Sequence, residues 1–230
     1  MTETKALRID RILSNLGYCS RREAKRFLRE YDVMCDGDRV ADPSSKADPR
    51  RLTINGEKMD HPGGILIVLN KPRGYVCSHD TSEGRRVYDL LPGRWLDRNP
   101  RVSSVGRLDK DTTGVLLVTD NTKLIHTLTS PRHHVAKTYL ATVDKPLDED
   151  VAKKFASGSL YLEGEKNPCR PAELRIVEPT RAEVTLTEGR YHQVRRMFAT
   201  CGFRVTGLHR VSFGDYGVNG LGPGEYRDVC

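Results

Sequence analysis

Two short stretches of the sequence combine residue types that could carry out catalysis. Residues 106–114, GRLDKDTTG, place Asp109 and Asp111 between glycines and directly before an apolar run. A carboxylate at the edge of a core has a pKa set by its surroundings, so it could act as an acid, a base or a nucleophile. From the spacing alone, an ordinary turn of Asp, Thr and Gly is the simpler explanation.

The second stretch is residues 188–197, EGRYHQVRRM, which holds three arginines and one acid around an aromatic residue. Guanidinium groups in this density suit phosphates or a buried carboxylate partner, and a solvated helix start explains them equally well. A third stretch, KTYL at residues 137–140, contains Tyr139. Near a nucleotide pocket this ring could stack on a base, whereas elsewhere it would serve packing.

These stretches lie in the longer, C-terminal part of the chain, where strand patterns outnumber helix patterns. We expect strands at residues 65–69, 115–118, 137–143 and 182–186, and helices at residues 148–156 and 193–200. Strands with few helices favour an α+β fold built on a mostly antiparallel mixed sheet. Residues 60–64, DHPGG, read as a linker in front of this part.

The N-terminal part shows helix signals followed by short strands. Its first apolar positions, 9, 12, 13 and 16, share one helical face, and Gly17 is expected to end that helix. Ser20 and Glu23 form a capping-box pattern that predicts a second helix from Ser20. Strands are expected at residues 31–35, 39–40 and 52–54, with turns at Asp36-Gly37 and Asn55-Gly56.

Basic residues are concentrated on these two predicted helices. Arg21 and Arg22 fall in the first turn of the second helix, where the helix dipole disfavours each cation by about 0.3–1 kcal/mol. This placement favours a phosphate-binding face, to which the backbone N–H groups also contribute. A solvated charged face is the plainer alternative.

The overall composition excludes several classes of protein. The 230 residues carry a formal net charge of +7, and no apolar run approaches the roughly 20 residues that span a bilayer. We therefore expect no membrane association and place the protein in the cytoplasm. The six cysteines form no C-x-x-C pair, and His126, His133 and His134 lack the spacing of a helical zinc site, so no metal is expected.

Two resemblances cover almost the full chain. Residues 7–10 (LRID), 17–24 (GYCSRREA) and the Asp36-Gly37 turn resemble the S4 RNA-binding module. The segments KPRG at 71–74, GRLD at 106–109, TTG at 112–114, KTY at 137–139 and RYHQVRRM at 190–197 resemble, in order and spacing, the S4-bearing pseudouridine synthases of ribosomal RNA. The segments SPRHH at 130–134 and 190–197 look closest to the branch acting on 16S rRNA. We expect an S4-like domain with linker at residues 1–60 and a catalytic domain at 61–230.

The second resemblance implies a role for each matching residue. Asp109 corresponds to the essential aspartate, Tyr139 to the aromatic residue that stacks on the target base, and Arg195 to the basic partner of the aspartate. Arg107 corresponds to the residue that helps to hold the place of the flipped-out nucleotide, and nothing carries over to Asp111. Further substrate RNA contacts are expected at Lys71, Arg190 and Arg196, and in the S4-like part at Arg8, Arg11, Arg21, Arg22 and Lys25.

The resemblance also implies an isomerisation that needs no cofactor, with ribosomal RNA or a pre-ribosomal particle as partner and a monomeric enzyme. Three alternatives stay open. The target could lie in 23S rRNA, or the chain could be a non-catalytic S4-type RNA-binding or ribosome-assembly protein. Asp109 and Asp111 could also act as a hydrolase pair on a glycosidic bond, although such carboxyls lie roughly 5–10 Å apart across the bond.

Overall fold

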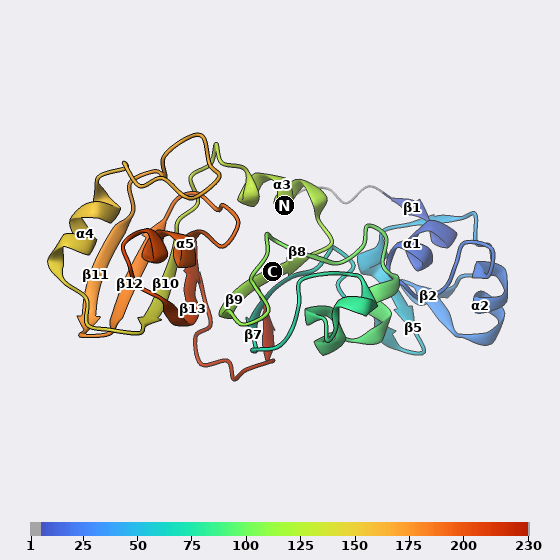
Figure 1. The fold of residues 1–230 in the computed structure, drawn as a ribbon. Helices are drawn as coiled ribbons and strands as arrows, with labels where there is room; N and C mark the ends of the chain where they lie inside the picture. The colour runs from blue at the N-terminus through green and yellow to red at the C-terminus, as the bar shows by residue number, and fades with distance from the viewer. Residues whose placement is uncertain (1–5, 230) are drawn as a thin grey trace.

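The computed structural model describes residues 6–229, and Figure 1 shows a small N-terminal body beside a long sheet. In the N-terminal body, α1 (Ile9–Asn15) and α2 (Ala24–Glu30) pack on a four-stranded antiparallel sheet of order β3-β2-β5-β6. Its strands are β2 (Val33–Cys35), β3 (Asp38–Arg39), β5 (Leu52–Ile54) and β6 (Glu57–Lys58), while β1 (Leu7–Arg8) pairs with β4 (Lys46–Ala47).

The local signals of this body are largely confirmed. The four apolar positions of the first helix are at most 6 % exposed and form its core with Leu28 and Leu52. In both predicted turns, Asp36-Gly37 and Asn55-Gly56, the two residues have positive φ, which matches the right-handed twist of the flanking strands.

The predicted start of the second helix is wrong. The backbone N–H and the hydroxyl of Ser20 both donate to the carboxylate of Glu23, and the N–H of Glu23 donates to the carbonyl of Ser20. This closed turn precedes the helix, which begins only at Ala24. Arg21 and Arg22 therefore lie in the turn before the helix and not in its first turn.

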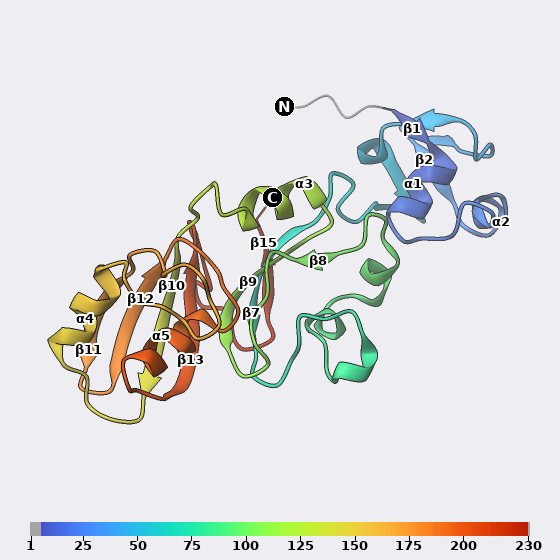
Figure 2. The ribbon, with the colours of Figure 1, turned by 45° about the horizontal axis from the view of Figure 1, so that its top comes forward.

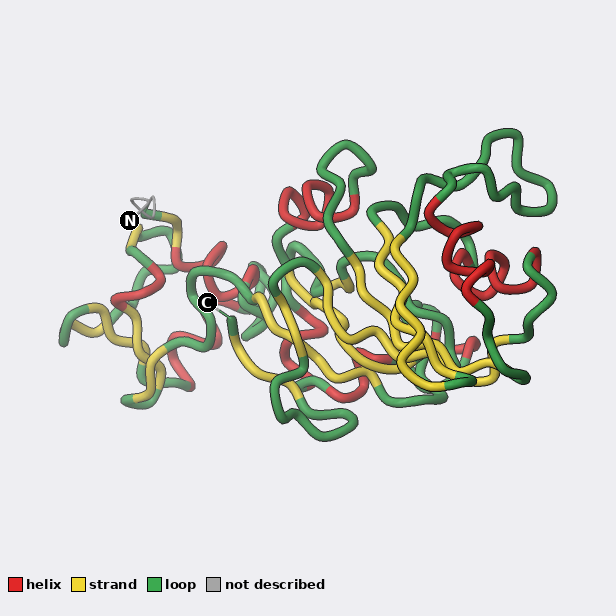
Figure 3. The backbone as a smooth tube through the Cα atoms, turned by 90° about the vertical axis from the view of Figure 1, so that its left-hand side faces the viewer, coloured by secondary structure: helices red, strands yellow, loops and turns green. Residues whose placement is uncertain are grey.

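The C-terminal part is built on one nine-stranded sheet, seen as a continuous curved layer in Figure 3. The main order is β11-β12-β10-β13-β9-β7-β15, and only the β13–β9 pair is parallel. The strands are β7 (Leu66–Lys71), β8 (Ser103–Ser104), β9 (Thr113–Thr119), β10 (Lys137–Val143), β11 (Glu173–Glu178), β12 (Arg181–Leu186), β13 (Val205–Phe213), β14 (Tyr216–Gly217) and β15 (Tyr226–Asp228). The expected mostly antiparallel α+β fold is confirmed.

Helices cover this sheet in separate regions. Figure 2 shows α4 (Glu149–Ala156) and α5 (Gln193–Thr200) over the outer half, where Phe155 and Phe198 pack with ring centroids 4.9 Å apart. Helix α3 (Thr122–Thr129) packs against the β9 half, together with Phe213. The short 3-10 helices are η1 (Pro49–Arg51) in the N-terminal body and η2 (Thr81–Glu83), η3 (Val87–Leu90) and η4 (Gly93–Asp97) beside β7. No described helix has the length and apolar character to cross a bilayer.

The N-terminal body is fixed to the C-terminal part through η4 as well as through the linker. The carboxylate of Asp60 accepts hydrogen bonds from Arg94 and from the indole N–H of Trp95, both at 2.6 Å. Gly17 has φ +77°, and a Cβ there would lie 2.4 Å from the carbonyl oxygen of Arg94. Glycine at this position thus ends α1 and also permits the close approach of η4.

Candidate active site

Asp109 lies in the loop between β8 and β9, and a buried lysine from β7 holds that loop. The ammonium of Lys71 donates to the carbonyls of Thr112 at 2.8 Å and of Lys110 and Pro72 at 3.2 Å. Lys71 is wholly buried, and burial lowers its pKa. Its expected contact with RNA is therefore wrong, because every part of the side chain is enclosed by protein. Lys71 instead positions the loop that carries Asp109.

Two basic side chains at the start of α5 reach the Asp109 carboxylate. Nε2 of His192 lies 3.2 Å from Oδ1, and Nε of Arg195 lies 3.7 Å from Oδ2. Residues i and i+3 share one face of a helix start, so a single turn supplies both contacts. Arg195 is fixed further by a hydrogen bond from its guanidinium to the carbonyl of Val205 at 3.1 Å. The expected Asp109–Arg195 pair thus comes together, and His192 joins it.

The turn that presents these groups is held by Gln193. Its side-chain amide donates to Glu188 at 2.6 Å, and its carbonyl oxygen accepts from the N–H of Arg190 at 2.9 Å. Gln193 is 4 % exposed, so this bracing lies inside the protein. His192 adopts the left-handed conformation, with φ +49° and ψ +34°, directly before the helix. The sequence analysis predicts no role for His192. Its position three residues before Arg195, on the same face of a helix start, is the pattern that could have indicated one.

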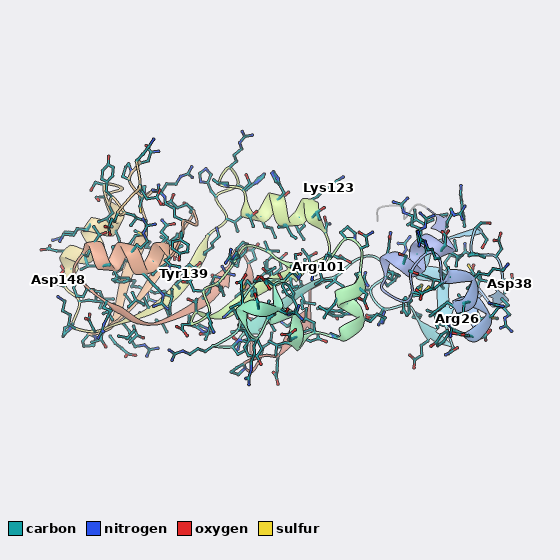
Figure 4. The ribbon with its side chains drawn as sticks, turned by 45° about the vertical axis from the view of Figure 1, so that its right-hand side comes forward. Arg26, Asp38, Arg101, Lys123, Tyr139 and Asp148 are labelled. Atoms are coloured by element: carbon teal, nitrogen blue, oxygen red, sulfur yellow. The ribbon has the colours of Figure 1, made fainter. Side chains whose placement is uncertain are left out.

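Asp109 and Tyr139 line a common cavity of about 550 Å³. Tyr139 is partly exposed on β10, with Val184 of β12 and Arg210 of β13 directly opposite it. In the view of Figure 4, Tyr139 lies between Asp148 at the outer end of the sheet and Lys123 of α3. A cavity of this size with an aromatic wall and a charged floor can admit a nucleotide base.

Arg107 and Asp111 differ clearly in position, although each lies two residues from Asp109. Arg107 is exposed and lines the cavity, as expected for a side chain that meets RNA. Asp111 does not line it; its carboxylate faces Arg73 at 3.3 Å at the surface, where its side chain is 62 % exposed. A hydrolytic pair formed by Asp109 and Asp111 therefore finds no support in this geometry.

Arg190 and Arg196 are occupied by protein groups. Arg190 donates to the carbonyls of residues 167 and 168 and forms an ion pair with Glu188. Arg196 forms an ion pair with Glu165 and donates to the carbonyls of residues 163 and 191. At most a quarter of either side chain is exposed. Both fasten the 163–168 loop to the start of α5, and Arg190 also lines the cavity, so the expected contact of each with RNA stays a prediction.

The basic residues of the N-terminal body divide into two groups. Arg8 and Arg21 pair with Asp10 at 2.9 and 3.3 Å, and the hydrogen bond from Arg8 is the main cause of the lowered pKa of Asp10. Three others are exposed and have no hydrogen-bond or ion-pair partner among residues 6–229: Arg11, Arg22 and Lys25. Of the five residues expected to contact RNA, these three therefore have side-chain charges that are not paired with a carboxylate in the described chain.

Within the described part of the chain, no group of three His, Cys, Asp or Glu side chains could bind a metal ion. His133 and His134 are exposed, as expected for surface residues. Asp109 thus has two basic partners and shares its cavity with the ring of Tyr139, a set suited to proton transfer or nucleophilic attack on a bound base or sugar.

Comparison with known proteins adds two family matches. A family described as RNA pseudouridylate synthase matches residues 65–200, and the S4 domain matches residues 7–50. A crystal structure titled pseudouridylate synthase superposes with a TM-score of 0.68 and 37 % identity, covering 97 % of this chain and 96 % of that one.

Curated relatives match along nearly their whole length. The protein named ribosomal small subunit pseudouridine synthase A of Yersinia pestis is 42 % identical over 228 residues, covering 97 % of this chain and 94 % of the relative. The protein of the same name from Escherichia coli K12 is 40 % identical over 228 residues, covering 97 % and 96 %. Both levels of identity are high enough to carry a family assignment.

Proposed function

The chain belongs to the RNA pseudouridylate synthase family, and from this premise we propose that it converts a uridine of small-subunit 16S rRNA into pseudouridine. The relatives at about 40 % identity carry the small-subunit name, and the S4 domain in front of the catalytic part is an RNA-binding module. The observation that carries the proposal is the carboxylate of Asp109 held between two basic groups in a cavity walled by Tyr139.

The reaction is an isomerisation in which the atoms balance within the nucleotide. The N1–C1′ bond breaks, the uracil turns, and a C5–C1′ bond forms. The hydrogen on C5 leaves as a proton and N1 gains one, so nothing is oxidised and no group is lost. The base must first leave its stack, at a cost of a few kcal/mol that is least in single-stranded RNA.

Asp109 is the group placed to act on the nucleotide. Its carboxylate is about one-third exposed toward the cavity. The guanidinium of Arg195 lies 3.7 Å from one carboxylate oxygen, and the imidazole of His192 lies 3.2 Å from the other. A carboxylate oriented in this way can attack the sugar or the ring, or remove a sugar proton.

Tyr139 and Arg107 act on the base and on the RNA around it. In this proposal the ring of Tyr139 stacks on the uracil and keeps it in the cavity while it turns. Arg107, exposed at the mouth, fills the place that the flipped nucleotide has left. Enclosure by the cavity limits access of water to the intermediate and so prevents loss of the base.

We assign residues 1–60 to RNA docking and residues 61–230 to catalysis. Arg11, Arg22 and Lys25 present free cations to the phosphate backbone, whereas recognition of the site rests on RNA shape. The substrate is free rRNA or an assembling particle, and we place the enzyme, as a monomer, in the cytoplasm where that RNA is made.

A pair of aspartate variants tests the proposal on 16S and 23S rRNA fragments. Wild type should form pseudouridine in a 16S fragment, Asp109→Asn should abolish it, and Asp111→Asn should leave it within about twofold, because Asp111 lies outside the cavity. Full activity of folded Asp109→Asn would refute the role of the carboxylate. Conversion only in 23S fragments would keep the chemistry and overturn the target, and binding without conversion would favour a non-catalytic protein.

A further inference from the structure

Arg210 is a buried arginine, and one of its two terminal guanidinium nitrogens, Nη2, has no hydrogen-bond partner among the described residues. The residue is 2 % exposed, and its Nε donates to the carbonyl of Val115 at 2.7 Å. A guanidinium is always charged and can only donate, so a buried N–H without an acceptor is costly. Arg210 also lines the cavity that holds Asp109, where a ligand could supply that acceptor.

The position of Arg210 relative to Tyr139 is set by the sheet. The two residues lie directly opposite each other on neighbouring antiparallel strands, so their side chains leave the same face. The guanidinium carbon is 6.0 Å from the centre of the Tyr139 ring. Because the guanidinium lies over the ring, a base held against Tyr139 would lie close to it.

A second residue that lines the same cavity also has an unsatisfied polar atom. The hydroxyl of Thr112 is buried, with the residue 1 % exposed, and it has no partner among residues 6–229. Five buried side-chain atoms in the described chain share this property, and only those of Thr112 and Arg210 belong to cavity-lining residues. Lys137, which also lines the cavity, is already satisfied by the carbonyl of Val135 at 2.9 Å.

We propose that Arg210 and Thr112 form the uracil-recognition subsite, in which Nη2 of Arg210 donates to a carbonyl oxygen of the flipped base and the Thr112 hydroxyl bonds to the same polar edge. This proposal rests on the proposed function. Uracil offers two carbonyl acceptors and one N–H donor on that edge. The Arg210 guanidinium can only donate, and the Thr112 hydroxyl can both donate and accept, so the two side chains can pair with these groups. Cytosine carries an amino donor in place of the carbonyl at position 4, so Arg210 donating at that position would reject it, whereas the Thr112 hydroxyl could pair with N3 of either base.

The test measures binding of short 16S fragments to protein carrying Asp109→Asn, so that no conversion occurs. The fragments carry uridine, 2-thiouridine, 4-thiouridine or cytidine at the target position. Uridine should bind about ten- to 100-fold more tightly than cytidine and than one of the two thio analogues, because sulfur is a poor acceptor. Adding Arg210→Lys should reduce each of these ratios to within about threefold.

Thr112→Val provides a variant that preserves shape. Removal of an unpartnered hydroxyl should leave the unfolding midpoint unchanged or raised, while the affinity for the uridine fragment falls. Thr138→Val is the matched control, because the Thr138 hydroxyl bonds to Thr185 and the residue does not line the cavity. It should leave that affinity intact.

Equal binding of all four fragments to the Asp109→Asn protein would overturn the subsite, and so would an unchanged preference in Arg210→Lys together with an unchanged uridine affinity in Thr112→Val. If Arg210→Lys fails to fold, the thio analogues and Thr112→Val still decide the matter. Failure of wild type to form pseudouridine in any fragment and in assembling particles would refute the proposed function, whereas base preference in the binding assay would still report on Arg210.

Discussion

Nε2 of His192 lies 3.2 Å from Oδ1 of Asp109, and this contact joins the loop before β9 to the turn before α5. His192 also has a left-handed backbone that most residues avoid. The imidazole therefore occupies a fixed place on the carboxylate, opposite the side that Arg195 approaches.

Replacement of His192 by Asn should lower kcat about ten- to 100-fold with KM changed less than about twofold. Asn tolerates the left-handed conformation, so the loss reports the missing ring and the less well oriented carboxylate. Steady-state kinetics on a 16S fragment measures both constants. Wild-type kcat in a folded His192→Asn protein would rule out a positioning role.

Lys71→Met should destabilise the protein by at least about 2 kcal/mol and lower kcat. The variant leaves three carbonyls at a buried position without their donor, and the loop that carries Asp109 loses its support. Urea unfolding and kinetics check the two effects together. A stable variant with weakened RNA binding and normal kcat would instead return Lys71 to the RNA-contacting group.

Arg22→Gln and Lys25→Gln should each weaken RNA binding and reduce the slope of log K against log salt by about 1. Both side chains are exposed without a partner, so each can neutralise a phosphate. The matched control is Arg196→Gln, whose guanidinium is occupied by Glu165. That variant should lower stability and leave the slope unchanged; a reduced slope would show that Arg196 reaches RNA after all.

His209 should make stability fall as the solution becomes acidic. Burial lowers its pKa below the ordinary 6.5, so below about pH 6.5 the unfolded chain binds a proton that the folded chain does not. The free energy of unfolding should therefore decrease as pH falls from 7.5 to 5.5, and less steeply in His209→Asn. An equal decrease in the variant would show that other groups cause the effect.

The sequence predicts the helices and strands around the site better than it predicts which of them pack or pair with one another. The strand at residues 137–143 and the helix at 193–200 match the structure because their apolar periodicity is local. The parallel pairing of β13 with β9, which brings Arg210 beside Gly114, has no local signal. Nor does the attachment of η4 to the N-terminal body through Asp60, since it depends on contacts between distant segments.

For the site, resemblance located Asp109, Tyr139 and Arg195; Asp109 and Tyr139 line one cavity, and Arg195 contacts Asp109. What Lys71 and Arg196 contact depends on burial and on distant segments, which neither the resemblance nor the charge reveals. The sequence does not show whether a lysine or arginine side chain is buried against protein groups or exposed to solvent. Only the fold distinguishes the two cases.

The central claim is tested most directly by mapping pseudouridine in the rRNA of cells with and without this protein, and of cells with Asp109→Asn in its place. We predict one 16S uridine that is modified only when the wild-type protein is present. Modification of that uridine in cells with Asp109→Asn, or an identical pseudouridine map with and without the protein, would contradict the account.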